Sequence, residues 1–213
     1  MLFDLDGTLV DTAPDMLGTL DDLRAELGLP ARDLWGLRAH VSRGALPLLD
    51  DGLPELARAV RLSLRDRYLA VYAARIARHS RVFPGLVPML EQARVHAIPW
   101  GVVTNKPFGL AQALLDALGQ HPGVLLGGDS LPEKKPHPLP VLTALERLGA
   151  AATDAWMIGD DARDIEAGRC AGCRTVACSY GYFDPAGGPA LWQADRIVDT
   201  PQQLAELLGD ALR

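Results

Sequence analysis

The sequence predicts an α/β fold: a Rossmann-like, doubly wound parallel sheet with an all-helical segment inserted near its beginning. From Pro84 to the end, short apolar runs alternate with amphipathic stretches of helical length, as in repeated strand–helix–strand units. Residues 14–80 carry helical periodicity only. Carboxylates and hydroxyls follow several of the apolar runs, which places them at the carboxyl ends of strands, where open α/β sheets bind ligands.

The α/β part is expected to begin with a strand that contains Leu2, Phe3 and Leu5 and to resume after Pro84. We expect helices and strands to alternate there, except for two successive strands near the end, because parallel strands need crossover connections between them. The expected helices are 86–95, 108–118, 138–148, 162–171 and 201–212, and the expected strands are 98–104, 123–127, 155–159, 174–178 and 195–198.

Residues 14–80 are predicted to form a helical cap domain, which leaves residues 1–13 and 81–213 for the α/β core domain. Pro14 and Asp15 are typical of a helix start, and Gly28 of its end. Hinges are expected near 11–15 and 79–84; the alternative is that these helices belong to the core. Apolar side chains recur at helical spacing at Met16, Leu17, Leu20, Leu23 and Leu27, and again at Leu62, Leu64, Tyr68, Leu69 and Tyr72.

The composition is that of an ordinary soluble globular protein. The 213 residues are 48% hydrophobic and 23% charged, enough for a core and a small second domain. A net charge of −6 argues against nucleic acid or an anionic membrane as partner. Apolar runs are too short for a membrane span, and aspartates interrupt the N-terminus too early for a signal peptide. We expect a cytoplasmic protein with a slightly short or trimmed start, monomeric or dimeric.

Three cysteines, Cys170, Cys173 and Cys178, are expected to be free thiols in a reducing compartment. The first two have zinc-like spacing, but a structural zinc site needs four ligands and no second pair or nearby histidine completes one.

The first motif, residues 2–12 with the sequence LFDLDGTLVDT, is the most informative segment. Asp4 and Asp6 are two residues apart in an extended chain, so their side chains share one side of the strand. Carboxylates so close repel each other unless a cation or a shared proton lies between them, and Mg²⁺ prefers such oxygen ligands. The structural alternative is an ordinary turn at Gly7 followed by the capping hydroxyl of Thr8.

Two later segments offer groups suited to a phosphate. Residues 98–105 end a strand with Thr104 and Asn105, whose hydroxyl and backbone N–H can bind phosphate oxygens. Lys135 precedes a proline, which restricts its backbone, and its ammonium is a compact charge suited to phosphate. We expect the neighbouring Lys134 to be solvated.

The last motif, AWMIGDDARDIEAG at residues 155–168, places Asp160, Asp161 and Asp164 directly after a strand. Carboxylates also stabilise the first turn of a helix. One helix needs only one such cap, and a cation explains the excess of acids.

In this order, the four segments resemble the motifs of the haloacid dehalogenase-like hydrolases: D-x-D-G-T-L-x-D-(T/S), the strand end, K-P-x-P and G-D-x-x-x-D. The resemblance covers the whole chain and is greatest to the phosphoglycolate phosphatase-like branch, whose helical cap follows the first motif. Several strings are also similar to N-acetylmuramic acid 6-phosphate phosphatases. The resemblance implies a Mg²⁺-dependent phosphatase that hydrolyses a small phosphate monoester through an aspartyl-phosphate.

The resemblance also implies a role for each motif residue. Asp4 is the nucleophile, and Asp6 is the general acid and base. Mg²⁺ is held by Asp4, by Asp160 and by the main-chain carbonyl of Asp6. The residues expected to bind the phosphate are Thr104, Asn105 and Lys135. The residues expected to orient the metal ligands without binding the metal directly are Asp164, Asp161 and Thr8.

Within the cap, residues 40–45 form a polar break between apolar helices. In capped relatives the equivalent loop covers the active site, so Ser42 and Arg43 are expected to contact the substrate. Arg43 suits a carboxylate or a second anionic group, although an exposed arginine is more often simply solvated.

Other functions remain to be weighed. Dehalogenases of this family lack an acid at the position of Asp6, so its presence argues against dehalogenation. Sugar-phosphate mutases share the motifs and stay open as a third reading. Residues 180–188 are expected to form a surface turn, with a border to the site as the alternative.

Overall fold

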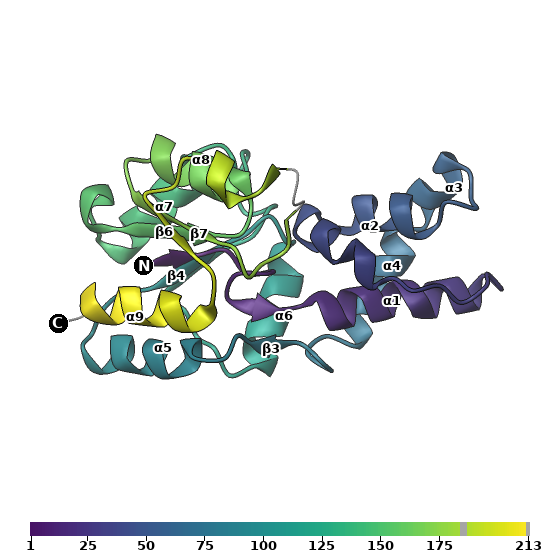
Figure 1. The fold of residues 1–213 in the computed structure, drawn as a ribbon, viewed down its shortest axis with the longest axis horizontal. Helices are drawn as coiled ribbons and strands as arrows, with labels where there is room; N and C mark the ends of the chain where they lie inside the picture. Colours follow the sequence, from purple (N-terminus) through teal and green to yellow (C-terminus); the bar gives the residue numbers. More distant parts are fainter. Residues whose placement is uncertain (184–186, 212–213) are drawn as a thin grey trace.

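A six-stranded parallel sheet forms the centre of the protein (Figure 1). The computed structural model describes residues 1–183 and 187–211. Strand order is β5-β4-β1-β6-β7-β8, and every neighbouring pair is parallel. The strands are β1 (Leu2–Phe3), β4 (Gly101–Val103), β5 (Val124–Leu126), β6 (Trp156–Gly159), β7 (Arg174–Cys178) and β8 (Arg196–Val198). The predicted α/β fold is confirmed.

Helices cover both faces of the sheet, as the apolar character of its strands requires. One face packs on α5 (Leu86–Val95), α6 (Phe108–Ala117) and α9 (Pro201–Ala211), and the other on α7 (Leu139–Leu148) and α8 (Ala162–Cys170). Figure 1 shows α5 and α9 side by side below the sheet and α7 and α8 above it. The predicted elements differ from these only by a few residues at their ends.

Five helices lie to one side of the sheet, and we refer to them as the cap helices. They share an apolar cluster of their own, in which Leu20, Leu49 and Tyr68 are fully buried. The stretch predicted around Leu62–Tyr72 divides into two helices, with the break at Leu64. The cap helices are α1 (Ala13–Glu26), the 3₁₀ helix η1 (Trp35–Arg43), α2 (Ala45–Gly52), α3 (Arg58–Ser63) and α4 (Arg65–Ala74).

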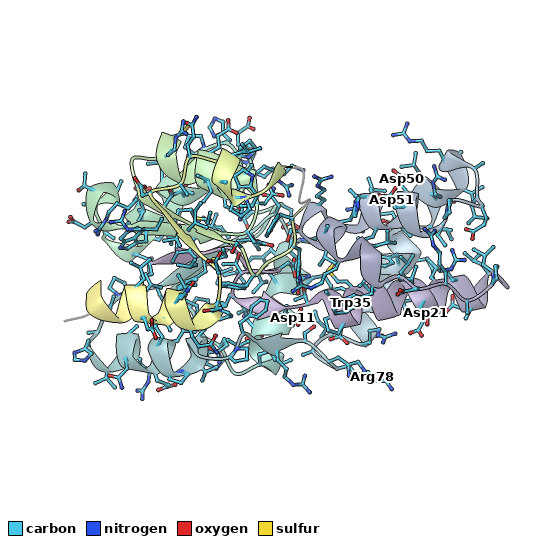
Figure 2. The ribbon with its side chains drawn as sticks, in the orientation of Figure 1. Asp11, Asp21, Trp35, Asp50, Asp51 and Arg78 are labelled. Atoms are coloured by element: carbon cyan, nitrogen blue, oxygen red, sulfur yellow. The ribbon has the colours of Figure 1, made fainter. Side chains whose placement is uncertain are left out.

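A buried arginine braces the cap helices. Arg24 is 1% exposed, pairs with Glu55 at 2.9 Å and donates to the carbonyl oxygen of Pro30 at 2.8 Å. On the part of the cap away from the sheet (Figure 2), Asp50 forms an ion pair with Arg61 at 2.9 Å, and His40 Nδ1 lies 3.1 Å from Asp51 Oδ2. A buried guanidinium needs such partners because desolvating an unpaired charge is costly.

Two short strands tie the connections between sheet and cap helices together. β2 (Val10–Asp11) pairs antiparallel with β3 (Arg81–Val82). Next to this ribbon, the Asp15 carboxylate accepts hydrogen bonds from the backbone N–H of His79 at 3.0 Å and from the Ser80 hydroxyl at 2.7 Å. Both segments that we expected to be hinges are therefore held to each other by hydrogen bonds.

Two further sequence predictions can be compared with the described residues. Within them no helix has both the length and the hydrophobicity that a membrane span requires. The three cysteines are free thiols; Cys173 and Cys178 are buried and Cys170 is exposed.

Candidate active site

A cavity of about 280 Å³ lies between the carboxyl ends of the central strands and the cap helices. Nine of the site residues predicted from the sequence line it together: Asp4, Asp6, Ser42, Arg43, Thr104, Asn105, Lys135, Asp161 and Asp164. The other two, Thr8 and Asp160, are fully buried and are joined to each other by a hydrogen bond of 2.9 Å.

Asp4 reaches the cavity because it directly follows β1, and its N–H donates to the carbonyl oxygen of Ile158 at 2.8 Å. The Lys135 ammonium lies 2.7 Å from Asp4 Oδ1 and 2.6 Å from Asp164 Oδ1, and it donates to the carbonyl oxygen of Val103 at 2.6 Å. Burial alone would lower the pKa of Lys135, but the charges of Asp164 and Asp4 outweigh it and raise the pKa. The two carboxylates therefore favour the charged form of Lys135 beside Asp4.

Asp160 is buried behind the residues that line the cavity, and it accepts hydrogen bonds from three parts of the chain. Thr8 donates to its Oδ1, while the Ser42 hydroxyl at 2.9 Å and the Tyr182 N–H at 2.7 Å donate to its Oδ2. The expectation of a surface turn at 180–188 was wrong for its first residues, because Tyr182 is 2% exposed. Residues 184–186 lie outside the described residues.

Two glycines allow the chain to close around Asp160. A Cβ atom on Gly7 would lie 2.1 Å from Asp160 Oδ2, and one on Gly181 would lie 2.2 Å from its Cβ. Gly7 also has a φ of +88°, a left-handed conformation that other residues rarely adopt. The glycine of the first motif is thus required both by its turn and by the space that Asp160 occupies.

Three carboxylates gather where a metal ion could bind. Oxygens of Asp4, Asp160 and Asp164 lie within 4.8 Å of one another, and all three residues are buried. Burial, followed by the charges of Asp4 and Asp164, raises the pKa of Asp160 well above its usual range. A cation relieves this repulsion, and a set of oxygen donors fits a hard divalent ion. The chemistry of the residues present is therefore compatible with a bound metal.

The main-chain carbonyl of Asp6 also faces this group. Its oxygen accepts from the Ser42 hydroxyl at 2.9 Å, the same hydroxyl that contacts Asp160. Ser42, which we expected on the substrate, thus contacts two of the oxygens expected to hold the metal.

The Asp6 side chain has a different partner, which the sequence analysis missed. Its two oxygens lie 3.0 and 3.2 Å from the ammonium of Lys106, which is buried. Desolvation would lower the pKa of Lys106, yet the charge of Asp6 raises it above its ordinary value. One signal was present in the sequence: Lys106 follows a strand and precedes Pro107, as Lys135 precedes Pro136.

Asp161 and Asp164 begin α8 with a reciprocal capping arrangement. Asp161 Oδ1 accepts from the Arg163 N–H at 3.0 Å, and Asp164 Oδ2 accepts from the Asp161 N–H at 3.1 Å. Burial opposes ionisation of Asp161, but the contacts with Arg163 prevail and lower its pKa. Arg163 also donates to the carbonyl oxygen of Ser42 at 2.9 Å and so holds the cap loop.

The remaining predicted residues differ in how firmly they are held. Thr104 is 4% exposed and accepts from the Lys106 N–H at 3.2 Å. Asn105 donates to the carbonyl oxygen of Lys135 at 2.9 Å, and its own Oδ1 is buried without a hydrogen-bond partner among the described residues. Arg43 lines the cavity and is exposed, as is Lys134.

Comparison with known proteins places this arrangement in a family. A sequence model described as haloacid dehalogenase-like hydrolase matches residues 1–172. The chain belongs to the haloacid dehalogenase-like hydrolases. A phosphoglycolate phosphatase of Xanthomonas campestris pv. campestris is 46% identical to this family member over 208 residues, which are 97% of this chain and 94% of that protein.

Two further similarities bear on this family member. An N-acetylmuramic acid 6-phosphate phosphatase of Pseudomonas aeruginosa is 40% identical over 220 residues, with 100% of this chain and 95% of that protein covered. A crystal structure described as a predicted phosphoglycolate phosphatase from Haemophilus somnus shares the fold with a TM-score of 0.84 at 28% identity, over 97% of this chain and 96% of that one. The protein is thus a phosphoglycolate phosphatase-like hydrolase.

Proposed function

We propose that the protein is a Mg²⁺-dependent phosphatase that hydrolyses a small phosphate monoester through an aspartyl-phosphate on Asp4. The observation that carries this proposal is the pairing of Asp4 with Lys135 at 2.7 Å inside the cavity. A carboxylate attacks an anionic phosphate only if their repulsion is neutralised, and a buried lysine beside the attacking oxygen does this.

The reaction that we propose has two steps. A carboxylate oxygen of Asp4 bonds to phosphorus while the bond from phosphorus to the ester oxygen breaks, and Asp6, which must enter this step as the protonated acid, gives that oxygen its proton and becomes a carboxylate. Asp6 then takes a proton from a water molecule, whose oxygen bonds to phosphorus and releases Asp4 and inorganic phosphate. Lys135, Thr104 and Asn105 would hold the phosphate oxygens throughout.

The metal in this proposal is Mg²⁺, held by Asp4, Asp160 and the main-chain carbonyl of Asp6. It would supply positive charge against the oxygens of the phosphate. Thr8 supports this set through its hydrogen bond to Asp160, and Asp164 through its ion pair with Lys135. Asp161 would act through Arg163, by fixing the cap loop at Ser42.

Phosphoglycolate is the substrate that we favour, because relatives named phosphoglycolate phosphatase align along nearly the whole chain. It carries a carboxylate beyond its phosphate, and the cap side of the cavity offers the exposed guanidinium of Arg43. A guanidinium binds a carboxylate well through two parallel hydrogen bonds.

N-acetylmuramic acid 6-phosphate is the alternative that one feature of the cavity favours. The cap contributes a wall of apolar and aromatic side chains, among them Met16, Leu69 and Tyr72. A carboxymethyl phosphate has little to place against such a wall, whereas an acylated sugar does. The volume of about 280 Å³ approaches the range of roughly 300–1,000 Å³ typical of ligand pockets.

We further propose that residues 14–80 form a cap domain and residues 1–13 and 81–213 a core domain. The separate apolar cluster of the cap helices supports this division. A reducing, cytoplasmic location is consistent with three free cysteines.

The proposal is tested by measuring inorganic phosphate released from both esters and from p-nitrophenyl phosphate, with Mg²⁺ and after dialysis against EDTA. We expect release that falls at least about 100-fold without Mg²⁺ and returns when it is added back. Full activity in excess EDTA would contradict the metal assignment, and an isomer without phosphate release would indicate a mutase.

A further inference from the structure

Lys106 has close contacts in the cavity, but the proposed reaction assigns it no role. Its ammonium contacts both oxygens of the Asp6 carboxylate, and the Lys106 side chain is 4% exposed. The ring of Tyr72 lies on another side of the ammonium, with 4.5 Å between Nζ and the ring centroid. Lys106 comes from the segment after β4, and Tyr72 comes from α4 of the cap helices.

These contacts restrict Asp6 closely. Among the described residues, the Asp6 carboxylate has hydrogen bonds to Lys106 only, so this one residue sets where its oxygens lie. The Tyr72 side chain is 1% exposed and its ring covers the ion pair from the cap side. Burying a lysine is unfavourable unless a carboxylate and an aromatic face replace its water.

Lys106 is poorly placed to bind the phosphate itself. Lys106 lines the cavity, but its ammonium is occupied by both Asp6 oxygens and by the Tyr72 ring, whereas the ammonium of Lys135 contacts Asp4, the proposed nucleophile. Each aspartate of the first motif is therefore held by its own lysine: Lys135 contacts Asp4, and Lys106 contacts Asp6.

We infer that Lys106 is a positioning residue, which holds the Asp6 carboxylate at the leaving-group oxygen while Tyr72 keeps water away from the pair. The inference rests on the proposed phosphatase function. It assigns to the cap a part in proton transfer: Tyr72 can cover Lys106 only when the cap helices lie against the sheet, as they do in this structure.

The test compares leaving groups in the Lys106→Met variant, which keeps the length of the side chain and removes its charge. Proton transfer to a departing group contributes about 100-fold or more when that group is a poor one. An alkyl phosphate needs this proton and p-nitrophenyl phosphate does not. We expect kcat to fall about 100-fold for the alkyl ester and less than about 10-fold for p-nitrophenyl phosphate, with little change in KM.

Two variants complete the experiment. Lys134→Met is the matched control, because it removes an exposed lysine with the same chemistry; its effect should be small and equal for both substrates. Tyr72→Leu removes the aromatic cover without touching the α/β part, and it should cause the same selective loss at smaller magnitude. Thermal unfolding of each variant checks the fold, and Tyr72→Leu decides the question if Lys106→Met does not fold.

An equal loss on both substrates, with a raised KM, would overturn the inference and make Lys106 a phosphate ligand. An unchanged alkyl-phosphate rate in Lys106→Met would overturn it as well. If the wild-type protein releases phosphate from neither ester, the proposed function fails, which is a distinguishable result.

Discussion

The two walls of the cavity differ in how their charges are held. On the wall formed by the strand ends, the buried and half-buried charged groups have fixed partners, whereas Lys134 is exposed: Asp4 and Asp164 share Lys135, Asp6 pairs with Lys106, and Asp161 pairs with Arg163. On the cap wall, Arg43 is exposed, and among the described residues Arg65 forms an ion pair only with its neighbour Asp66, which is itself exposed. The ion pairs therefore fix the charged side chains of the strand-end wall before substrate binds. On the cap wall, the exposed Arg43 is available to contact the substrate.

The chemistry and the choice of substrate are therefore expected on different walls of the cavity. A buried charge needs a partner, so removing one member of a buried pair leaves the other unpaired at a large desolvation penalty. Removing a solvent-exposed charge changes the free energy little. Changes to Asp4 and Lys135 should therefore affect every phosphate ester alike, and the effect of changes to Asp6 and Lys106 should depend only on how readily the leaving group departs. Changes on the cap wall should affect only those esters whose distal part the cap contacts.

The largest expected effect is that of Asp4→Asn. The variant keeps the shape of the side chain and removes the nucleophile, so phosphate release should fall at least about 1,000-fold on every ester. Steady-state assays on acidic and neutral esters measure this, with thermal unfolding as the check on the fold. Retention of more than a few per cent of activity would show that Asp4 does not form the covalent bond.

Lys135→Ala should rank next. The loss of a buried, charge-assisted contact costs on the order of 2–4 kcal/mol in the transition state, which corresponds to roughly two to three decades in kcat/KM. The neighbouring Lys134→Ala is the matched control, because this lysine is exposed, and its effect should be mild. Similar losses in the two variants would mean that the buried ion pairs do not set Lys135 apart.

A smaller and selective effect is expected on the cap wall. Arg43→Ala should weaken kcat/KM for acidic esters by about 10-fold, because one exposed charge-assisted contact contributes roughly 1–2 kcal/mol. The kcat/KM for p-nitrophenyl phosphate, which carries no charge beyond its phosphate, should change little. A uniform loss on both would show that Arg43 supports the loop rather than the substrate, and no loss would show that it is only solvated.

The smallest effect concerns the stability of the cap helices. Hydrogen bonds from Arg24 lower the pKa of Glu55 from its ordinary value of 4.5 to about 2. Because the folded-state pKa is depressed, this pair stabilises the protein above pH 4.5, and the contribution is lost as the pH falls towards 2. The melting temperature of Glu55→Gln should therefore depend less steeply on pH in this window than that of the wild type. Parallel curves would contradict the assignment.

The sequence was sufficient to predict the position of residues that directly follow a strand. Asp4, Thr104 and Asp160 each follow an apolar strand, and parallel strands bring their ends to one edge, so the fold itself predicts their proximity. The start of α8 is likewise local, because Asp161 and Asp164 cap the helix that they begin.

Other parts could not be predicted because they depend on contacts between distant segments. Tyr72 meets Lys106 only through the folded cap, and Tyr182 reaches Asp160 from a loop whose composition resembles a surface turn. The ribbon of β2 and β3 consists of two residues on each side, which is too short for any alternation of apolar and polar residues.

Trapping the phosphorylated enzyme tests directly whether Asp4 forms the covalent intermediate. In Asp6→Asn, p-nitrophenolate can leave without a proton, but the water that should hydrolyse the intermediate lacks its base. Mixing this variant with p-nitrophenyl phosphate and Mg²⁺ should give a burst of about one equivalent of p-nitrophenolate. Borohydride reduction followed by peptide mass spectrometry should then locate the acyl phosphate at residue 4. The absence of a burst, or a label at any other residue, would contradict the covalent role of Asp4.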